Sequence, residues 1–251
     1  MMFEKYIPEE GKNTAGTLIG RMMDGFDSGV SYADMMRYRI SGKAACECRD
    51  VYYVAHDSEK ALGRLWHGWG RHADAIGNWG NFYTDESCRG QGIGGGLLRL
   101  WQEDIEKEKT PPLCFLCTAA TKELTDLYRR LGFRPAIEGR ECGPLYRPCG
   151  DSPETFKEFC DRYYKPSGVL TLKKATLEYR HEIDCLLKFA YVDIGLQFGL
   201  SGLKGVEEAL LYSKEKAGML FSQDGHCVGW SFDGEIQLHP LYKDAEIVSG
   251  L

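Results

Sequence analysis

The residues from Arg89 to Gly96 have the composition and backbone freedom of a phosphate-binding segment. A β-rich segment precedes this glycine-rich loop, and an amphipathic segment from Leu97 to Lys109 follows it. Glycines allow successive backbone N–H groups to point toward one site, and a helix N-terminus adds its unpaired N–H groups and the positive end of its dipole. The spacing therefore predicts a diphosphate-binding loop between a strand and a helix.

Two common nucleotide loops match these residues only in part. The glycine-rich loop lacks the Lys-Ser/Thr pair that ends a Walker motif, and the dinucleotide-binding pattern around it is incomplete. Both nucleotide interpretations are therefore weakened.

The loop resembles the acetyl-CoA loop of the GNAT superfamily of N-acetyltransferases, whose pattern is Arg/Gln-x-x-Gly-x-Gly/Ala. Arg89, Gly92 and Gly94 occupy the defined positions of that pattern. Residues 82–90 are similar to the fourth strand of the family, and residues 127–133 are similar to a second family motif. The resemblance covers roughly residues 16–147 and is strongest from residue 79 to 133.

This resemblance implies an α+β fold with three α/β/α layers around a mixed, largely antiparallel sheet of the acyl-CoA N-acyltransferase type. It implies acetyl-CoA as cosubstrate, no metal, and transfer of the acetyl group to a primary amine of a small-molecule or peptide acceptor. The cofactor-binding residues that it implies are Tyr83, Thr84, Arg89, Gly90, Gln91, Gly92, Ile93, Gly94, Gly95, Gly96 and Thr121.

Acetyl transfer requires a deprotonated amine, hydrogen-bond donors for the developing oxyanion and an acid for the departing thiolate. Tyr128 occupies the position at which many family members carry a tyrosine that protonates the CoA sulfur. The alternative for Tyr128 is a packing role beside Leu124 and Leu131.

Candidates for the other two roles lie at the end of the fourth strand. Asp85 and Glu86 are the candidate general bases, with Glu86 preferred, and only one of these adjacent side chains can face the cleft. Two acids beside a turn are also typical of a solvated surface. A backbone N–H near Tyr83 or Thr84 is the expected oxyanion donor, because the fourth and fifth strands of this family separate there.

Aromatic and imidazole side chains gather around the third and fourth strands, and they have two interpretations. One is an acceptor pocket. The other is sheet-face packing for the tryptophans and surface-loop positions for the histidines. The residues concerned are Trp66, His67, Trp69, His72 and Trp79.

Composition limits the class of protein. The chain has 251 residues with 43% hydrophobic content, which suits a packed core in one large or two small domains. The net charge of −6 argues against a nucleic-acid partner. No leader opens the sequence, and no apolar run approaches the roughly 18 residues of a membrane span. We therefore expect a soluble, cytoplasmic protein without nucleic-acid or membrane partners.

Ten cysteines are expected to be reduced thiols in such a compartment. Cys46 with Cys48, and Cys114 with Cys117, have no second ligand pair at zinc spacing. Small core residues are therefore favoured over a structural metal site.

The sequence divides into an acetyl-CoA-binding domain over residues 1–150 and a C-terminal unit over residues 151–251. The C-terminal unit carries strand-like runs from 218 to 238 and resembles a partial acetyltransferase repeat, with Asp244 to Glu246 standing where a cofactor loop would be. It holds 11 Lys and Arg against 16 Asp and Glu, a surplus that either attracts a cationic amine or serves as a solvated surface. We expect this unit to pack against the first domain or against a second copy in a homodimer.

Two other functional classes stay open. A non-catalytic acyl-CoA-binding or regulatory module would bind the cofactor without turnover. A nucleotide-dependent enzyme would bind ATP or NAD in preference to coenzyme A.

Overall fold

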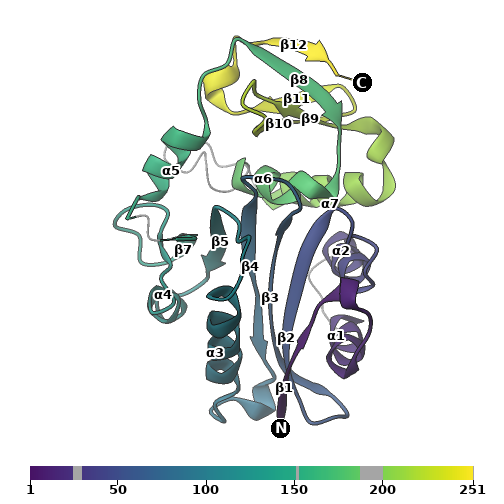
Figure 1. Ribbon diagram of the computed structural model, residues 1–251, viewed down its shortest axis with the longest axis vertical. Helices are drawn as coiled ribbons and strands as arrows, with labels where there is room; N and C mark the ends of the chain where they lie inside the picture. Colours follow the sequence, from purple (N-terminus) through teal and green to yellow (C-terminus); the bar gives the residue numbers. More distant parts are fainter. Residues whose placement is uncertain (25–29, 151–152, 187–199, 251) are drawn as a thin grey trace.

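The computed structural model describes residues 1–24, 30–150, 153–186 and 200–250, and within these ranges the strands form two sheets (Figure 1). The first sheet contains β1 (Met2–Tyr6), β2 (Cys48–His56), β3 (Ala61–Gly70), β4 (Ile76–Thr84), β5 (Cys114–Ala119), β6 (Arg134–Pro135) and β7 (Gly143–Pro148). Its strand order is β1-β2-β3-β4-β5-β7-β6. All neighbours are antiparallel except β4 and β5, which confirms the predicted mixed, largely antiparallel sheet.

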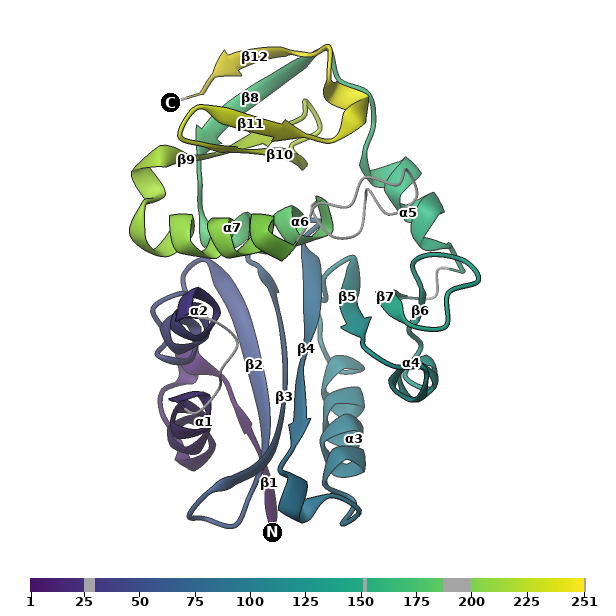
Figure 2. The same ribbon diagram turned by 180° about the vertical axis from the view of Figure 1, so that it is seen from behind.

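Helices cover both faces of the first sheet. The helices of this part are α1 (Thr14–Asp24), α2 (Val30–Ile40), α3 (Ile93–Ile105) and α4 (Lys122–Arg129), with short 3-10 helices η1 (Pro8–Glu10) and η2 (Glu86–Cys88). Side chains alternate along β2, so that Tyr52 and Val54 pack with α1 while Val51 and Tyr53 pack with α3. The predicted α/β/α layering follows from this alternation (Figures 1 and 2).

Strands β4 and β5 pair over a short length and then separate. Their register joins Ile76 to Cys114 and Asn78 to Leu116, and no further β4–β5 pair occurs in the described residues. Beyond this point β4 has a register shift against β3, and Asn81 takes a positive φ of 55°. The resulting opening, here called the β4–β5 fork, begins directly after Asn78, which is earlier than the expected position at Tyr83 and Thr84.

The second sheet contains β8 (Val169–Lys174), β9 (Ala217–Phe221), β10 (Cys227–Phe232), β11 (Glu235–Leu238) and β12 (Glu246–Ser249). Its order is β11-β10-β9-β8-β12, with β12 parallel to β8 and the other neighbours antiparallel. The helices of this part are α5 (Phe156–Tyr163), η3 (Leu177–Tyr179), α6 (Arg180–Asp184), α7 (Leu200–Tyr212), η6 (Lys214–Lys216) and η7 (Pro240–Tyr242).

The second sheet and its helices pack against the first sheet, which is one of the two arrangements expected from the sequence. Helices α6 and α7 lie across the end of the first sheet in both views (Figures 1 and 2). One apolar cluster joins Ile76 and Leu116 to Leu170, and another joins Met35 to Ile183. The two parts therefore share buried cores.

Several local predictions need correction. Helix α3 begins at Ile93 rather than Leu97, and the C-terminal strand β12 was not predicted. The N-terminal segment contains the strand β1, which pairs with β2. The apolar spacing of the sequence also predicts a break between two helices at residues 24–29 and a helix over residues 177–191, and both predictions lie partly outside the described residues. In the described part of the chain, no helix combines the length and apolar character needed to cross a membrane.

Candidate active site

The glycine-rich loop lies between β4 and α3, as its sequence predicted, but the 3-10 helix η2 precedes it and residues 93–96 form the first turn of α3. Gly90 and Gly92 have φ values of 79° and 80°, which place both in the left-handed region that favours glycine. Gly92 is the N-cap of α3 and supplies no side chain to the helix end. Within the described residues, the first helical hydrogen bond of α3 runs from the Gly96 N–H to the Gly92 carbonyl at 2.9 Å. The preceding N–H groups of the first turn are therefore available for an anion.

The glycines of this segment differ in what surrounds them. A Cβ on Gly90, Gly92 or Gly95 would meet no described atom within 4 Å, so this side of the loop is open. A Cβ on Gly96 would instead collide with the Phe3 ring of β1. Gly96 is therefore required by packing, whereas the open positions leave room for a ligand to approach the backbone.

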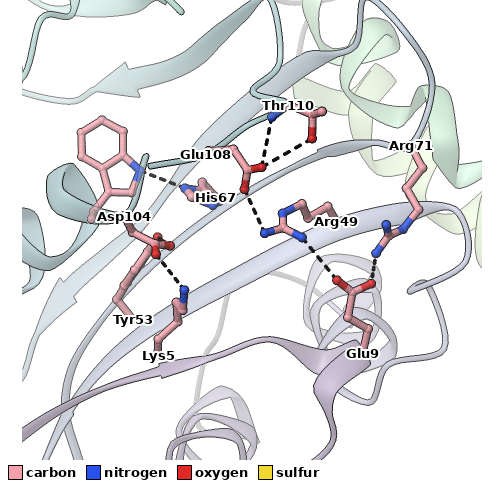
Figure 3. A network of polar contacts seen from close by, with 10 residues as sticks. Lys5, Glu9, Arg49, Tyr53, His67, Arg71, Asp104, Glu108 and Thr110 are labelled. Atoms are coloured by element: carbon pink, nitrogen blue, oxygen red, sulfur yellow. Dashed lines mark hydrogen bonds and ion pairs between the residues drawn. The ribbon is translucent and has the colours of Figure 1, made fainter. Parts of the chain in front are cut away.

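Helix α3 is attached to the sheet by polar contacts that range from buried to exposed (Figure 3). The Trp101 indole N–H donates to Nδ1 of His67 at 2.8 Å, and the Tyr53 hydroxyl donates to Asp104 at 2.7 Å. Burial lowers the pKa of His67 to about 3, which keeps its imidazole neutral and able to accept. Lys5 also donates to Asp104 at 2.7 Å. These contacts fix the direction of α3, and hence of its N-terminus.

A chain of ion pairs follows α3 toward its C-terminal end in the same view (Figure 3). Arg49 lies 2.9 Å from a carboxylate oxygen of Glu108 and 3.4 Å from one of Glu9. Glu9 also pairs with Arg71. Strand β2 thereby joins the segment after α3 to η1 at the N-terminus.

Tyr128 lies at the β4–β5 fork. Its side chain is 5% exposed, and its ring meets Trp79 edge-on with the centroids 4.7 Å apart. Trp79 directly follows the last paired residue of β4, and Phe82 lies 6.3 Å from Tyr128 between ring centroids. Burial raises the pKa of the Tyr128 phenol above its ordinary value of 10.0. The hydroxyl is therefore protonated at neutral pH, as a general acid requires.

Thr121 caps the helix that carries Tyr128. Its hydroxyl oxygen accepts the N–H of Leu124 at 3.3 Å, as the side chain of an N-cap residue does. Gly132 ends this helical segment with a φ of 88°, and Phe133 is buried beyond it. The second motif of the sequence thus builds a capped helix whose inner face carries the tyrosine.

The two candidate bases lie in the turn before the glycine-rich loop. Asp85 accepts hydrogen bonds from the N–H and hydroxyl of Ser87 at 2.9 and 2.5 Å, and these bonds lower its pKa. The Glu86 side chain is 79% exposed and lies 3.2 Å from Arg89. Their described contacts are with the turn and loop, and neither is described in contact with Tyr128.

A cavity of 390 Å³ lies beside β4 on the face covered by α1. It is lined by Leu18, Arg21, Met22, Glu59, Lys60, Ala61, Arg64, Tyr83 and Asp85. Arg64 is only 2% exposed, and its guanidinium lies 5.1 Å from the centroid of the Tyr83 ring. This α1–β3 cavity therefore combines cationic and anionic side chains at the end of β4.

The pocket expected from the tryptophans and histidines differs from this cavity. His67 is buried beneath α3, which contradicts its expected surface-loop position. His72 lies 3.1 Å from a carboxylate oxygen of Glu182 and stacks on Tyr179. The three tryptophans are buried in the sheet, so the packing interpretation holds for them; these are Trp66, Trp69 and Trp79.

The cysteines and acids offer no described metal site. All ten cysteines are free thiols. Across the described ranges, no group of three His, Cys, Asp or Glu side chains is arranged to hold a metal ion.

The family model of the acetyltransferase (GNAT) domain matches residues 48–135. The matched range extends from β2 to β6 and contains the glycine-rich loop, α3 and α4, so this part of the chain is similar to a GNAT domain. No curated protein matches the chain.

Solved structures that are similar to the chain have low sequence identity to it. The NatC complex bound to Gag peptide and CoA has a chain with 15% identity and a TM-score of 0.42, covering 60% of this chain and 100% of that one. Escherichia coli ElaA has 12% identity and a TM-score of 0.42, with 59% and 99% covered. The GNAT family N-acetyltransferase YhbS from Escherichia coli, in complex with CoA, has 13% identity and a TM-score of 0.40, with 60% and 82% covered.

Proposed function

We propose that this protein transfers the acetyl group of acetyl-CoA to a primary amine. The observation that carries the proposal is the position of the open glycine-rich loop and the protonated Tyr128 relative to the β4–β5 fork. The loop offers backbone N–H groups to a diphosphate, and the fork separates two strands whose backbone groups are then free to bind an extended ligand.

In the proposed reaction, the amine nitrogen attacks the carbonyl carbon of the thioester. A C–N bond forms, the C–S bond breaks, and Tyr128 gives its proton to the departing thiolate. Backbone N–H groups of β4 beyond Asn78, including those near Tyr83 and Thr84, stabilise the oxyanion. The amine loses its proton to water or to one of the candidate bases, Asp85 or Glu86. The products are an amide and coenzyme A.

The α1–β3 cavity is our candidate for the acceptor site. It reaches Tyr83 and Asp85 at the end of β4, from the face opposite α3. Its volume of 390 Å³ is in the range of small-molecule sites. The lining contains the cations Arg21, Lys60 and Arg64 beside carboxylates. This mixture suits an acceptor that carries an acidic group in addition to its amine.

Calorimetry with acetyl-CoA, followed by detection of free thiol with a panel of amines, tests the proposal. We expect binding of acetyl-CoA in the micromolar range, a raised melting temperature and amine-dependent thiol release. Binding without turnover for any amine would favour the non-catalytic acyl-CoA-binding module. Binding of ATP or NAD in preference to CoA would favour the nucleotide-dependent alternative.

A further inference from the structure

Helix α6 of the C-terminal unit meets β4 at the segment where that strand pairs with β5. The backbone N–H of Ile76 donates to Oε1 of Glu182 at 2.8 Å, and Nδ2 of Asn78 donates to Oδ2 of Asp184 at 2.7 Å. Ile76 and Asn78 are the first and last residues of β4 that pair with β5. Two carboxylates from one short helix therefore hold both ends of the paired segment.

Both carboxylates are inaccessible to solvent. Glu182 is 0% exposed and Asp184 is 1% exposed. Charges in such positions are stable only when they have close partners. Glu182 also contacts His72 at 3.1 Å, and Asp184 pairs with Arg180. Moving either side chain would leave a buried charge without its partners, so the arrangement resists displacement.

The position of the β4–β5 fork depends on this segment. Pairing ends at Asn78, and the strand turns away at the residues that follow, where Trp79 contacts Tyr128. A shift of Asn78 along or across the sheet would move both the opening of the fork and the aromatic residues beside it. The contact that restrains Asn78 comes from Asp184.

We propose that Glu182 and Asp184 are positioning residues that fix the β4–β5 fork for cofactor binding, so that the C-terminal unit supports acetyl-CoA affinity without touching the cofactor. This inference rests on the proposed function, because it assumes that the acyl end of acetyl-CoA enters the fork. It assigns the C-terminal unit a role in the site of the first domain.

Three substitutions test the proposal by their acetyl-CoA affinity, measured calorimetrically at a temperature where each variant is folded. Asn78→Leu and Asp184→Ala remove the contact from its two sides. We expect each to weaken binding on the order of tenfold, a typical coupling between sites. Asp184→Asn keeps an oxygen that can accept from Asn78, and it should restore most of the affinity despite the lost charge.

Glu207→Gln is the matched control. Glu207 is 5% exposed and lies 2.7 Å from Arg180, but no contact between Glu207 and β4 is described. It should lower the melting temperature and leave acetyl-CoA affinity within about twofold of wild type, since its effect is on stability alone. Equal weakening by Glu207→Gln, or unchanged affinity in Asn78→Leu, would overturn the proposal.

Hydrogen exchange of the wild-type protein provides a test that needs no variant. Coupling is reciprocal, so a contact that favours cofactor binding must itself be stabilised by the cofactor. We expect acetyl-CoA to slow exchange in residues 177–186 as well as in the loop and α3. Slowing confined to residues 79–105 would overturn the positioning role while leaving the proposed function intact. Failure of the wild-type protein to bind acetyl-CoA would overturn both.

Discussion

The segments that follow β4 and β11 begin alike and then diverge. After β4, Asp85 caps the 3-10 helix η2 by accepting the N–H of Ser87 at 2.9 Å. After β11, His239 caps the 3-10 helix η7 by accepting the N–H of Leu241 at 3.3 Å. The sheets also share an order, since β1-β2-β3-β4 and β8-β9-β10-β11 are both antiparallel successions. This order agrees with a partial duplication, which stays a prediction.

The difference lies in what comes next. The first segment continues into glycines with positive φ and the N-terminus of α3, which present N–H groups to an open space. The second continues through Asp244 into β12, whose backbone pairs with β8. A strand followed by a capped turn therefore does not by itself produce a cluster of open backbone N–H groups. The glycines and the helix N-terminus provide the open N–H groups of the first segment, whereas the second segment adds a strand to its sheet.

The largest contrast between the units is expected for their tyrosines. Tyr128→Phe should lower kcat by about 10²–10⁴-fold with little change in acetyl-CoA affinity, because it removes a proton donor while keeping the ring packed. Steady-state thiol release and calorimetry measure the two quantities separately. If the chemical step is rate-limiting and kcat falls by less than about threefold, Tyr128 is a packing residue and not the general acid.

Tyr242 of the second unit is the control for that substitution. Its hydroxyl is buried without a described hydrogen-bond partner, and burial raises its pKa to about 12. Tyr242→Phe should leave both kcat and affinity unchanged, and it removes a hydroxyl whose burial is uncompensated.

The next contrast concerns glycines of the two units. Gly92 and Gly234 have φ values of 80° and 86°, and a Cβ on either would meet no described atom within 4 Å. Gly92→Val and Gly234→Val should each cost about 1–3 kcal/mol of stability through backbone strain. Only Gly92→Val should weaken acetyl-CoA binding, by about 10- to 100-fold if charge-assisted hydrogen bonds are lost. Equal acetyl-CoA affinities for the two variants would show that the glycine-rich loop is not part of the binding site.

Gly95→Ala sharpens the comparison within the loop itself. Gly95 lies in the first turn of α3 with open space at its Cβ, so alanine should raise the free energy of unfolding by about 0.5–1 kcal/mol. We expect the same change to weaken acetyl-CoA binding, since the Cβ would occupy the ligand's approach. Gly96→Ala should instead destabilise the fold through Phe3. Chemical denaturation of both variants checks these opposite changes in stability, and calorimetry measures their acetyl-CoA affinity.

The smallest expected effect concerns the two residues that cap 3-10 helices, Asp85 of η2 and His239 of η7. They should differ in how much they make the stability of the fold depend on pH. Burial lowers the pKa of His239 from 6.5 to about 4, so between these values the unfolded chain binds a proton that the folded chain does not. The free energy of unfolding therefore falls as the pH drops from 6.5 toward 4. Asp85, whose pKa is lowered by its bonds to Ser87, stays charged in this window.

His239→Asn isolates this contribution, because asparagine can cap a helix without titrating. We expect the stability difference between pH 7 and pH 5 to be smaller in the variant than in wild type, as measured by chemical denaturation. His67 has the same sign of pH dependence, with its pKa lowered to about 3, and contributes equally to both proteins. An unchanged pH dependence in His239→Asn would show that the η7 cap does not titrate in this range.

Local sequence predicted the parts of the candidate site that depend on neighbouring residues. The φ values of Gly90 and Gly92, the Thr121 cap and the helix end at Gly132 follow from the properties of single residues and their immediate neighbours. The amphipathic spacing around Tyr128 likewise placed its side chain on the buried face.

Contacts between distant residues could not be predicted in the same way. His67 has no local signal that places it beneath Trp101, and nothing near Asn78 indicates that Asp184 will accept its amide hydrogen. The β-branched residues Ile247 and Val248 indicated a strand at β12. Its parallel pairing with β8 could not be predicted, because β8 lies far away in the chain.

The sequence by itself determined the three-layer arrangement of the first sheet and the open glycine-rich loop, since strand alternation, helix periodicity and glycine conformation act over a few residues. Only the tertiary structure decided where β4 leaves β5, which side chains line the α1–β3 cavity, and how α6 buries its carboxylates against β4. These features depend on which segments meet in space, and their energies come from burial and pairing between residues that are separated along the chain.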